Sequence, residues 1–226
     1  MPRHFHEELD QVKEQILRMG SIVETLLENA VAALVDRDSR LAEATIAGDA
    51  KADTLEVEID EACIRLLALQ QPAAGDLRFI TTAMKISSDL ERMADQAVNI
   101  SQRTLELNEE PQLKPYLDIP IMGQLAQRML RESLDAFVRK DAVLARHVIE
   151  ADGKVDALKH QVFRELLTFM MEDPRTIPRA IRLILVSRHL ERVADHATNI
   201  AEMVVFLVEG KNIRHSGKPR QEDVAP

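Results

Sequence analysis

The stretch LERMADQAVNI at residues 90–100 returns as LERVADHATNI at residues 190–200. The repetition continues upstream, where Asp49 and Asp53 in the first copy correspond to Asp152 and Asp156 in the second. The upstream pairs are 103 residues apart and the downstream pairs 100, so the second copy lacks three residues between them. Such a deletion belongs in a loop. A period of about one hundred is too long for a solenoid and indicates a duplicated domain.

The composition favours an all-helical protein. The chain has 226 residues with only seven glycines, one tyrosine and no tryptophan, which is poor in turn-forming and strand-forming residues. Its net charge of −9 argues against nucleic-acid binding, which needs a basic face. An acidic surface suits cations or a basic patch on a partner instead.

Localisation is predicted from what the chain lacks. The single Cys63 cannot form an internal disulfide, so we expect a reducing compartment and a buried structural thiol. The first residues, MPRHFHEE, contain no apolar core of a signal peptide, and the longest apolar runs are too short to cross a bilayer. We therefore expect a protein of a reducing compartment that is not inserted in a membrane.

Apolar residues at three- and four-residue spacing predict six helices. The expected spans are about residues 7–36, 39–70, 76–107, 120–139, 141–171 and 175–209. Short connections make neighbouring helices antiparallel, so each half is predicted to be a three-helix bundle, and all six helices to pack as one elongated body. The expected domains are residues 1–110 and 116–210, followed by a disordered polar tail over residues 211–226.

Carboxylates gather on one helix face in each half. Glu91, Asp95 and Asn99 are four residues apart and so lie one turn apart on one face. Counting along the hairpin brings Asp49 and Asp53 beside them. We call Asp49, Asp53, Glu91 and Asp95 the first acidic seam. The corresponding residues of the second half form the second acidic seam, namely Asp152, Asp156, Glu191 and Asp195, with Asn199 on the same helix.

Such clusters require protonation, basic partners or a metal ion, because like charges repel at this spacing. Oxygen donors suit Mg²⁺, Mn²⁺, Ca²⁺ or iron, and His160 could add a nitrogen in the second half. The simpler interpretation is a solvated acidic stripe paired with arginines such as Arg92 and Arg192. The chain keeps both acids and the asparagine while neighbouring positions vary, and this retention favours metal or partner binding.

These motifs resemble the PhoU family. The doubled LERxADxAxNI is joined by PAAGDLR at residues 72–78 and by DHATNIAE at residues 195–202, and the similarity spans about residues 5–210. The resemblance implies a non-enzymatic cytoplasmic protein built from two three-helix bundles that carry multinuclear iron or zinc clusters. It also implies a regulator that couples the phosphate ABC transporter, through its ATPase subunit, to a sensor histidine kinase. Such a regulator restrains the phosphate-starvation response when phosphate is plentiful.

The resemblance also assigns the metal ligands. Iron, zinc, manganese or magnesium would be held in the first half by Asp49, Asp53, Glu91, Asp95 and Asn99. In the second half they would be held by Asp152, Asp156, Glu191, Asp195, Asn199 and Glu202. Gln102 stands where the second half has Glu202, so the first site is expected to hold fewer metals or to hold them less tightly. We also expect a homodimer.

Two other interpretations remain open from the sequence. A carboxylate-bridged metalloenzyme would also use acidic helix faces, although no Glu-x-x-His pair is present. A purely structural helical adaptor would bind no metal. There is no Gly-rich phosphate loop after a strand and no visible nucleophile with an adjacent base. His189 lies off the acidic face and is predicted to be a surface or capping residue.

Overall fold

A computed structural model describes residues 3–70 and 72–213 of the chain. Within these ranges the chain is helical apart from its connections, as the composition predicted. The elements, in chain order, are α1 (Arg3–Asp36), α2 (Ser39–Gly48), α3 (Ala50–Gln70), α4 (Ala74–Asn108), α5 (Asp118–Arg139), α6 (Ala142–Glu172), the 3-10 turn η1 (Pro174–Thr176) and α7 (Ile177–Glu209).

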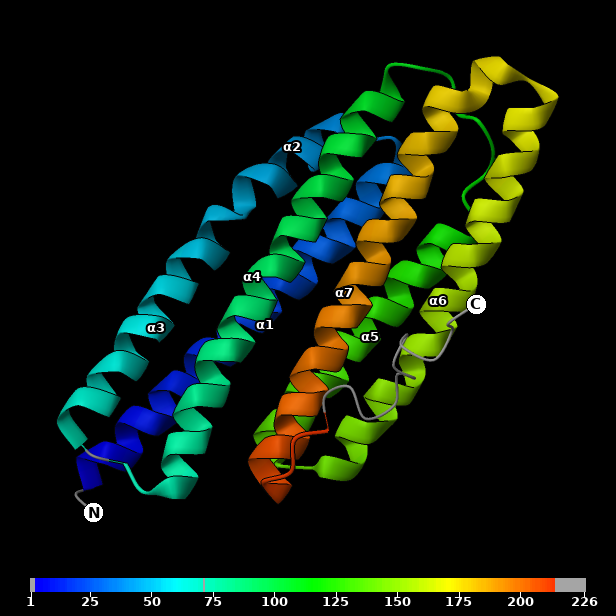
Figure 1. The fold of residues 1–226 in the computed structure, drawn as a ribbon. Coiled ribbons are helices and arrows are strands. Elements are labelled where there is room, and N and C mark those ends of the chain that lie inside the picture. The colour runs from blue at the N-terminus through cyan, green and yellow to red at the C-terminus, as the bar shows by residue number, and fades with distance from the viewer. Residues whose placement is uncertain (1–2, 71, 214–226) are drawn as a thin grey trace, which may run out of the picture.

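The two predicted three-helix repeats pack side by side as one elongated body (Figure 1). Helices α1, α4, α5 and α7 are central, while α3 packs against α1 and α4 at one edge and α6 packs against α5 and α7 at the other. The tail predicted over residues 211–226 falls almost wholly outside the described residues. In the part of the chain that the structure describes, every helix is too short or too polar to pass through a membrane.

One predicted helix is wrong in detail. The span expected over residues 39–70 is interrupted at Asp49, which separates α2 from α3. Gly48 lies at this break, and glycine is among the weakest helix formers. The position equivalent to Gly48 in the second half is Ala151, the best helix former, and α6 continues through it without interruption. The interruption gives the backbone at Asp49 a local turn within the first acidic seam.

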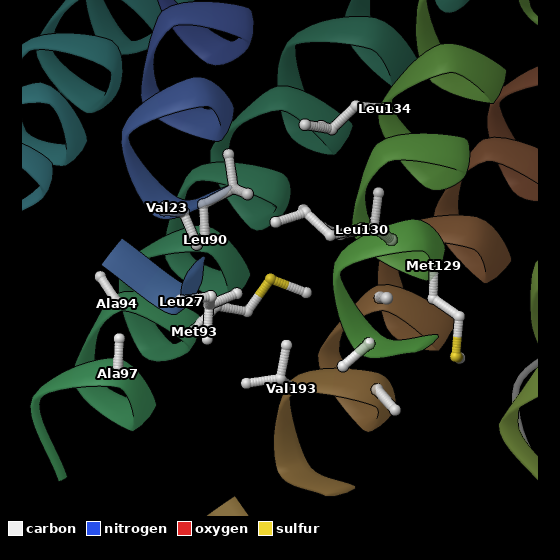
Figure 2. Packing of buried hydrophobic residues seen from close by; sticks show 14 of the residues in the cluster. Val23, Leu27, Leu90, Met93, Ala94, Ala97, Met129, Leu130, Leu134 and Val193 are labelled. Carbon is white, nitrogen blue, oxygen red and sulfur yellow. The ribbon is translucent and has the colours of Figure 1, made fainter. Parts of the chain in front are cut away.

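The hydrophobic core is continuous across both halves. Figure 2 shows Leu27, Met93, Leu130 and Val193 lying toward one another from α1, α4, α5 and α7. All four side chains are at most 1% exposed. Cys63 is also buried in this core, as expected, and burial raises the pKa of its thiol to about 12. The halves are therefore repeats in sequence that share one core in space.

Two equivalent glycines set the distance between α1 and α5. A Cβ atom added to Gly20 would collide with the Leu134 side chain, and one added to Gly123 would lie 2.9 Å from Cγ2 of Val31. Gly20 corresponds to Gly123, and Val31 corresponds to Leu134, at the offset of 103. Helices α1 and α5 therefore contact each other twice through equivalent pairs of residues. An approximate twofold axis between the halves relates the two contacts.

The turn after the first helix of each half is also built alike. Arg37 and Lys140 both adopt left-handed backbone angles, with φ of 55° and 52°. The next residue in each case caps a helix: Asp38 accepts from the Leu41 amide, and Asp141 accepts from the amides of the second and third residues after it. These caps explain why both turns carry an aspartate at the same place in the repeat.

Candidate functional site: two acidic seams

The first acidic seam is assembled across the α3–α4 hairpin, as the residue count predicted. Burial, followed by the negative charges of Asp53 and Asp95, raises the pKa of Asp49 to about 6. Burial and the neighbouring carboxylates likewise raise the pKa of Glu91 to about 6. The pKa of Asp95 is also raised, first by burial and then by Asp53. The charge of Asp53 therefore lies close enough to Asp49, Glu91 and Asp95 to disfavour their ionisation.

Glu56 is a fifth acid of the first acidic seam that was not predicted from the sequence. It lies on α3, three residues after Asp53, and its charge raises the pKa of Glu91. The pKa of Glu56 itself is raised by burial and then by Asp60 and Asp53, although Arg92 lowers it. The signal was present in the sequence, because a residue three positions after Asp53 shares its helix face.

The second acidic seam contains its own cation. The Lys159 ammonium on α6 donates to Oδ1 of Asp156 at 2.7 Å and to Oε1 of Glu191 on α7 at 2.8 Å. Partial burial lowers the pKa of Lys159, but the hydrogen bonds to the two carboxylates outweigh it and the net shift is upward. Asp156 and Glu191 thus lie on either side of one ammonium, and the lysine between them was not predicted from the sequence.

The remaining predicted site residues have different surroundings. Asn99 is half-buried on α4. Asn199 donates from Nδ2 to Oδ1 of Asp89 at 3.3 Å, so its amide group is directed across the interface between α4 and α7. His160, the candidate nitrogen donor, is exposed on α6 and lines a groove together with Lys159 and Glu191. Asp152, Asp195 and Glu202 lie on α6 and α7, and Asp195 is the exposed one of the three.

His189 is not a surface or capping residue, contrary to expectation. Its Nδ1 lies 2.8 Å from Oε1 of Gln96, while Nδ1 of His196 lies 2.8 Å from Oδ1 of Asp89. The two contacts join equivalent positions of the repeat, because Asp89 corresponds to His189 and Gln96 corresponds to His196 at the offset of 100. Burial, followed by the charges of nearby arginines, lowers the pKa of His189 to about 4. Paired polar side chains therefore join the halves near the twofold axis.

Comparison with known proteins extends over nearly the whole chain. A family model described as the PhoU domain matches twice, at residues 16–104 and 119–204. This chain belongs to the PhoU family. A relative from Aquifex aeolicus, described as a phosphate-specific transport system accessory protein PhoU homolog, is 48% identical over 92% of this chain and 95% of its own. A homolog of the same description from Pseudomonas aeruginosa is 43% identical over 98% and 92%.

Solved structures agree with this assignment. The crystal structure of PhoU from Pseudomonas aeruginosa matches with a TM-score of 0.89 and 44% identity, covering 92% of this chain and 100% of that one. PhoU from Streptococcus pneumoniae, described as a phosphate transport system regulatory protein, matches with a TM-score of 0.86 and 33% identity, covering 92% and 98%. PhoU proteins are accessory regulators, so the chain is not an enzyme, and the metalloenzyme interpretation loses its support.

The two seams fit a metal ion differently. Within the described residues, no three His, Cys, Asp or Glu side chains are arranged ready to hold one. In the first seam of this PhoU protein, however, Oδ1 of Asp49 is buried without a hydrogen-bond partner, and clustered carboxylates supply oxygen donors that hard cations prefer. In the second seam the Lys159 ammonium already bridges Asp156 and Glu191. The first seam therefore combines an unpartnered carboxylate oxygen with neighbouring acids, whereas the second already holds an ammonium between two of its acids.

A groove opens beside the second seam of this PhoU chain. It has a volume of about 390 Å³ and lies between α6 and α7. Phe163 and Ile184 supply its apolar lining, and Lys159, Glu191 and Arg188 contribute charged groups. Phe163 is 48% exposed, which is high for a large aromatic side chain. The groove thus combines apolar surface with the charged end of the seam.

Burial and crowding of the acids in the first seam make the stability of the protein depend on pH. Asp49 and Glu91 ionise more readily in the unfolded chain than in the folded one, so the free energy of unfolding falls as pH rises from about 4 to about 6. We expect the double variant Asp49→Asn/Glu91→Gln to be more stable than the wild type at about pH 7. We expect its free energy of unfolding to rise by about 1 kcal/mol, because solvent screens these partly exposed charges.

Urea unfolding in the presence of a chelator measures this difference. The gain should shrink as pH falls and vanish near pH 3, below the ordinary pKa values of both groups, where the wild-type carboxyl groups are protonated in the folded and the unfolded state. Glu58→Gln is the matched control, because Glu58 is an exposed acid on α3 that causes none of the shifts in the seam. A double variant no more stable than Glu58→Gln at about pH 7 would contradict the raised pKa values of Asp49 and Glu91.

Proposed function

We propose that this protein regulates phosphate uptake and phosphate-starvation signalling through protein contacts on the cytoplasmic side of the membrane. Its partners are the ATPase subunit of the phosphate ABC transporter and the sensor histidine kinase of the phosphate regulon. It restrains the starvation response when phosphate is plentiful, and phosphate status reaches it through the transporter. The observation that carries the proposal is similarity over nearly the whole chain to accessory proteins of phosphate-specific transport.

The contact surface that we propose is the α6–α7 groove together with the second acidic seam. Protein interfaces place aromatic side chains in desolvated pockets and surround them with charged groups. Phe163 supplies the aromatic side chain here, and Arg188 and Glu191 lie at the same groove. A partner helix with an apolar face and basic flanks matches this surface, because the four carboxylates of the seam outnumber Lys159 and Arg188. We also propose that the protein acts as a homodimer, which sedimentation analysis tests directly.

We further propose that the first acidic seam holds a metal ion, with Asp49, Asp53, Glu91 and Asp95 as oxygen ligands and Asn99 beside them. Iron, zinc, manganese and magnesium are the candidates. The unpartnered Oδ1 of Asp49 supports this assignment. The metal would supply positive charge that holds α3 and α4 at a fixed spacing. If elemental analysis of the untagged protein finds no metal, the metal-free adaptor becomes the better description of this half.

Phe163→Ser should weaken binding to the kinase or to the ATPase subunit at least about tenfold, because interface aromatics contribute a large share of binding energy. Ile64→Ser is the matched control. Ile64 is 57% exposed, and its equivalent in the second repeat is Leu167, which lies one turn beyond Phe163 on α6 and does not line the groove. Biolayer interferometry with each purified partner measures the change. Equal affinities for the wild type and Phe163→Ser, with both partners, would remove the groove from the proposed interface.

A further inference from the structure

The two seams differ in charge at one equivalent position. Glu56 in α3 corresponds to Lys159 in α6 at the offset of 103. The first seam therefore gains a fifth carboxylate where the second gains an ammonium. The first seam responds with raised pKa values at Asp49 and Glu91, whereas two carboxylates of the second are paired with the lysine.

Lys159 occupies the place where a shared cation would bridge the hairpin. Its ammonium lies within 2.8 Å of one carboxylate oxygen on α6 and one on α7. The lysine side chain is 25% exposed and that of Glu191 is 19% exposed, so the pair is partly shielded from water. Bridging of carboxylates from two helices is what a metal ion does in an acidic helical bundle.

We propose that Lys159 is a built-in counter-ion that replaces a metal ion in the second seam. A metal approaching Asp156 and Glu191 would have to break two charge-assisted hydrogen bonds and remain beside a like charge. Metal binding is thereby confined to the first half, and the second half keeps a fixed, metal-independent surface. The inference rests on the proposed function only for what the first seam binds.

This assignment reverses an expectation from the sequence. Gln102 in place of Glu202 led us to expect weaker metal binding in the first half. The contacts of Lys159 argue for weaker binding in the second half, because a bound ammonium outweighs one additional acid farther along α7. Within one regulator, a metal-responsive half would then be joined through a common core to a half that metal availability leaves unchanged.

Charge exchange at the equivalent positions tests the proposal. The chelator-treated protein is titrated with Mn²⁺ by calorimetry, and bound Mn²⁺ is counted by electron paramagnetic resonance. Lys159→Glu should gain a second-seam site that is at least about tenfold tighter than any second-seam binding by the wild type, a difference of about 1.4 kcal/mol. Glu56→Lys should lose first-seam binding by a similar factor. Lys154→Glu makes the same charge change at an exposed position of α6 and should leave Mn²⁺ binding unchanged.

Lys159→Met guards against misfolding of the more acidic variant. It removes the ammonium without adding a carboxylate, and it should also open the second seam to Mn²⁺. The proposal is overturned if neither Lys159 variant gains a site while circular dichroism shows both folded. It is also overturned if Glu191→Gln/Asp195→Asn lowers Mn²⁺ binding by the wild type. If Lys159→Glu gains a Mn²⁺ site and the wild type binds no Mn²⁺, the role of Lys159 is upheld. Only the metal ion in the first seam is then removed from the proposed function.

Discussion

Gly123→Leu should lower the free energy of unfolding by about 3 kcal/mol, the largest loss we expect from a single substitution. A Cβ atom alone would lie 2.9 Å from Cγ2 and 3.3 Å from Cγ1 of Val31. Valine is stiff about its first side-chain torsion, so α1 and α5 must separate to admit a larger group. The helix propensity gained on losing glycine, at most about 1 kcal/mol, offsets only part of that cost.

Gly153→Leu is the matched control for this prediction. Gly153 lies inside α6, is exposed, and would meet no atom within 4 Å of an added Cβ. The same substitution there should be neutral or stabilise the protein by up to about 1 kcal/mol, because only helix propensity changes. Urea unfolding followed by circular dichroism compares the two. If both variants unfold at the same urea concentration, the α1–α5 crossing does not depend on the glycine.

Asp89→Ala should lower the free energy of unfolding by about 2 kcal/mol, because it removes a polar contact between α4 and α7. Asp89 is only 7% exposed, and its Oδ1 accepts from Asn199 and lies 2.8 Å from Nδ1 of His196. Removing the acceptor leaves partly buried polar groups on α7 without a partner, and the desolvation of such groups is not recovered. The loss should appear in chemical denaturation as a lower midpoint.

Asp89→Asn separates the hydrogen bond from the packing. Its carbonyl oxygen keeps an acceptor at the same place, so we expect a loss below about 1 kcal/mol. The pair of variants therefore tests whether the contact works as an acceptor for α7. An Asp89→Ala protein as stable as the wild type would show that the α4–α7 interface relies on apolar packing alone.

Much of the architecture could be predicted from the sequence because duplication preserves position along the chain. The doubled LERxADxAxNI motif indicated two equivalent halves, and helical spacing placed Glu91 and Asp95 on one face. Hairpin length then brought Asp49 and Asp53 beside them. Each of these steps depends on local geometry, which follows from 3.6 residues per turn and a short connection. The break at Asp49 was predictable in principle from Gly48, but a single glycine is a weak signal.

The tertiary structure alone decided which side chains meet across helices distant in sequence. Three contacts depend on how the two halves pack. They are the contact of His189 with Gln96, the hydrogen bond from Asn199 to Asp89, and the close approach of α1 and α5 at the two glycines. Lys159 is a further example. Helical spacing places it near the acids, but only the packing of α6 against α7 shows that its ammonium bridges Asp156 and Glu191. Periodicity determines the face of a helix on which a residue lies. The contacts of a long side chain are determined by the neighbouring helices, because their distance and register decide what it can reach.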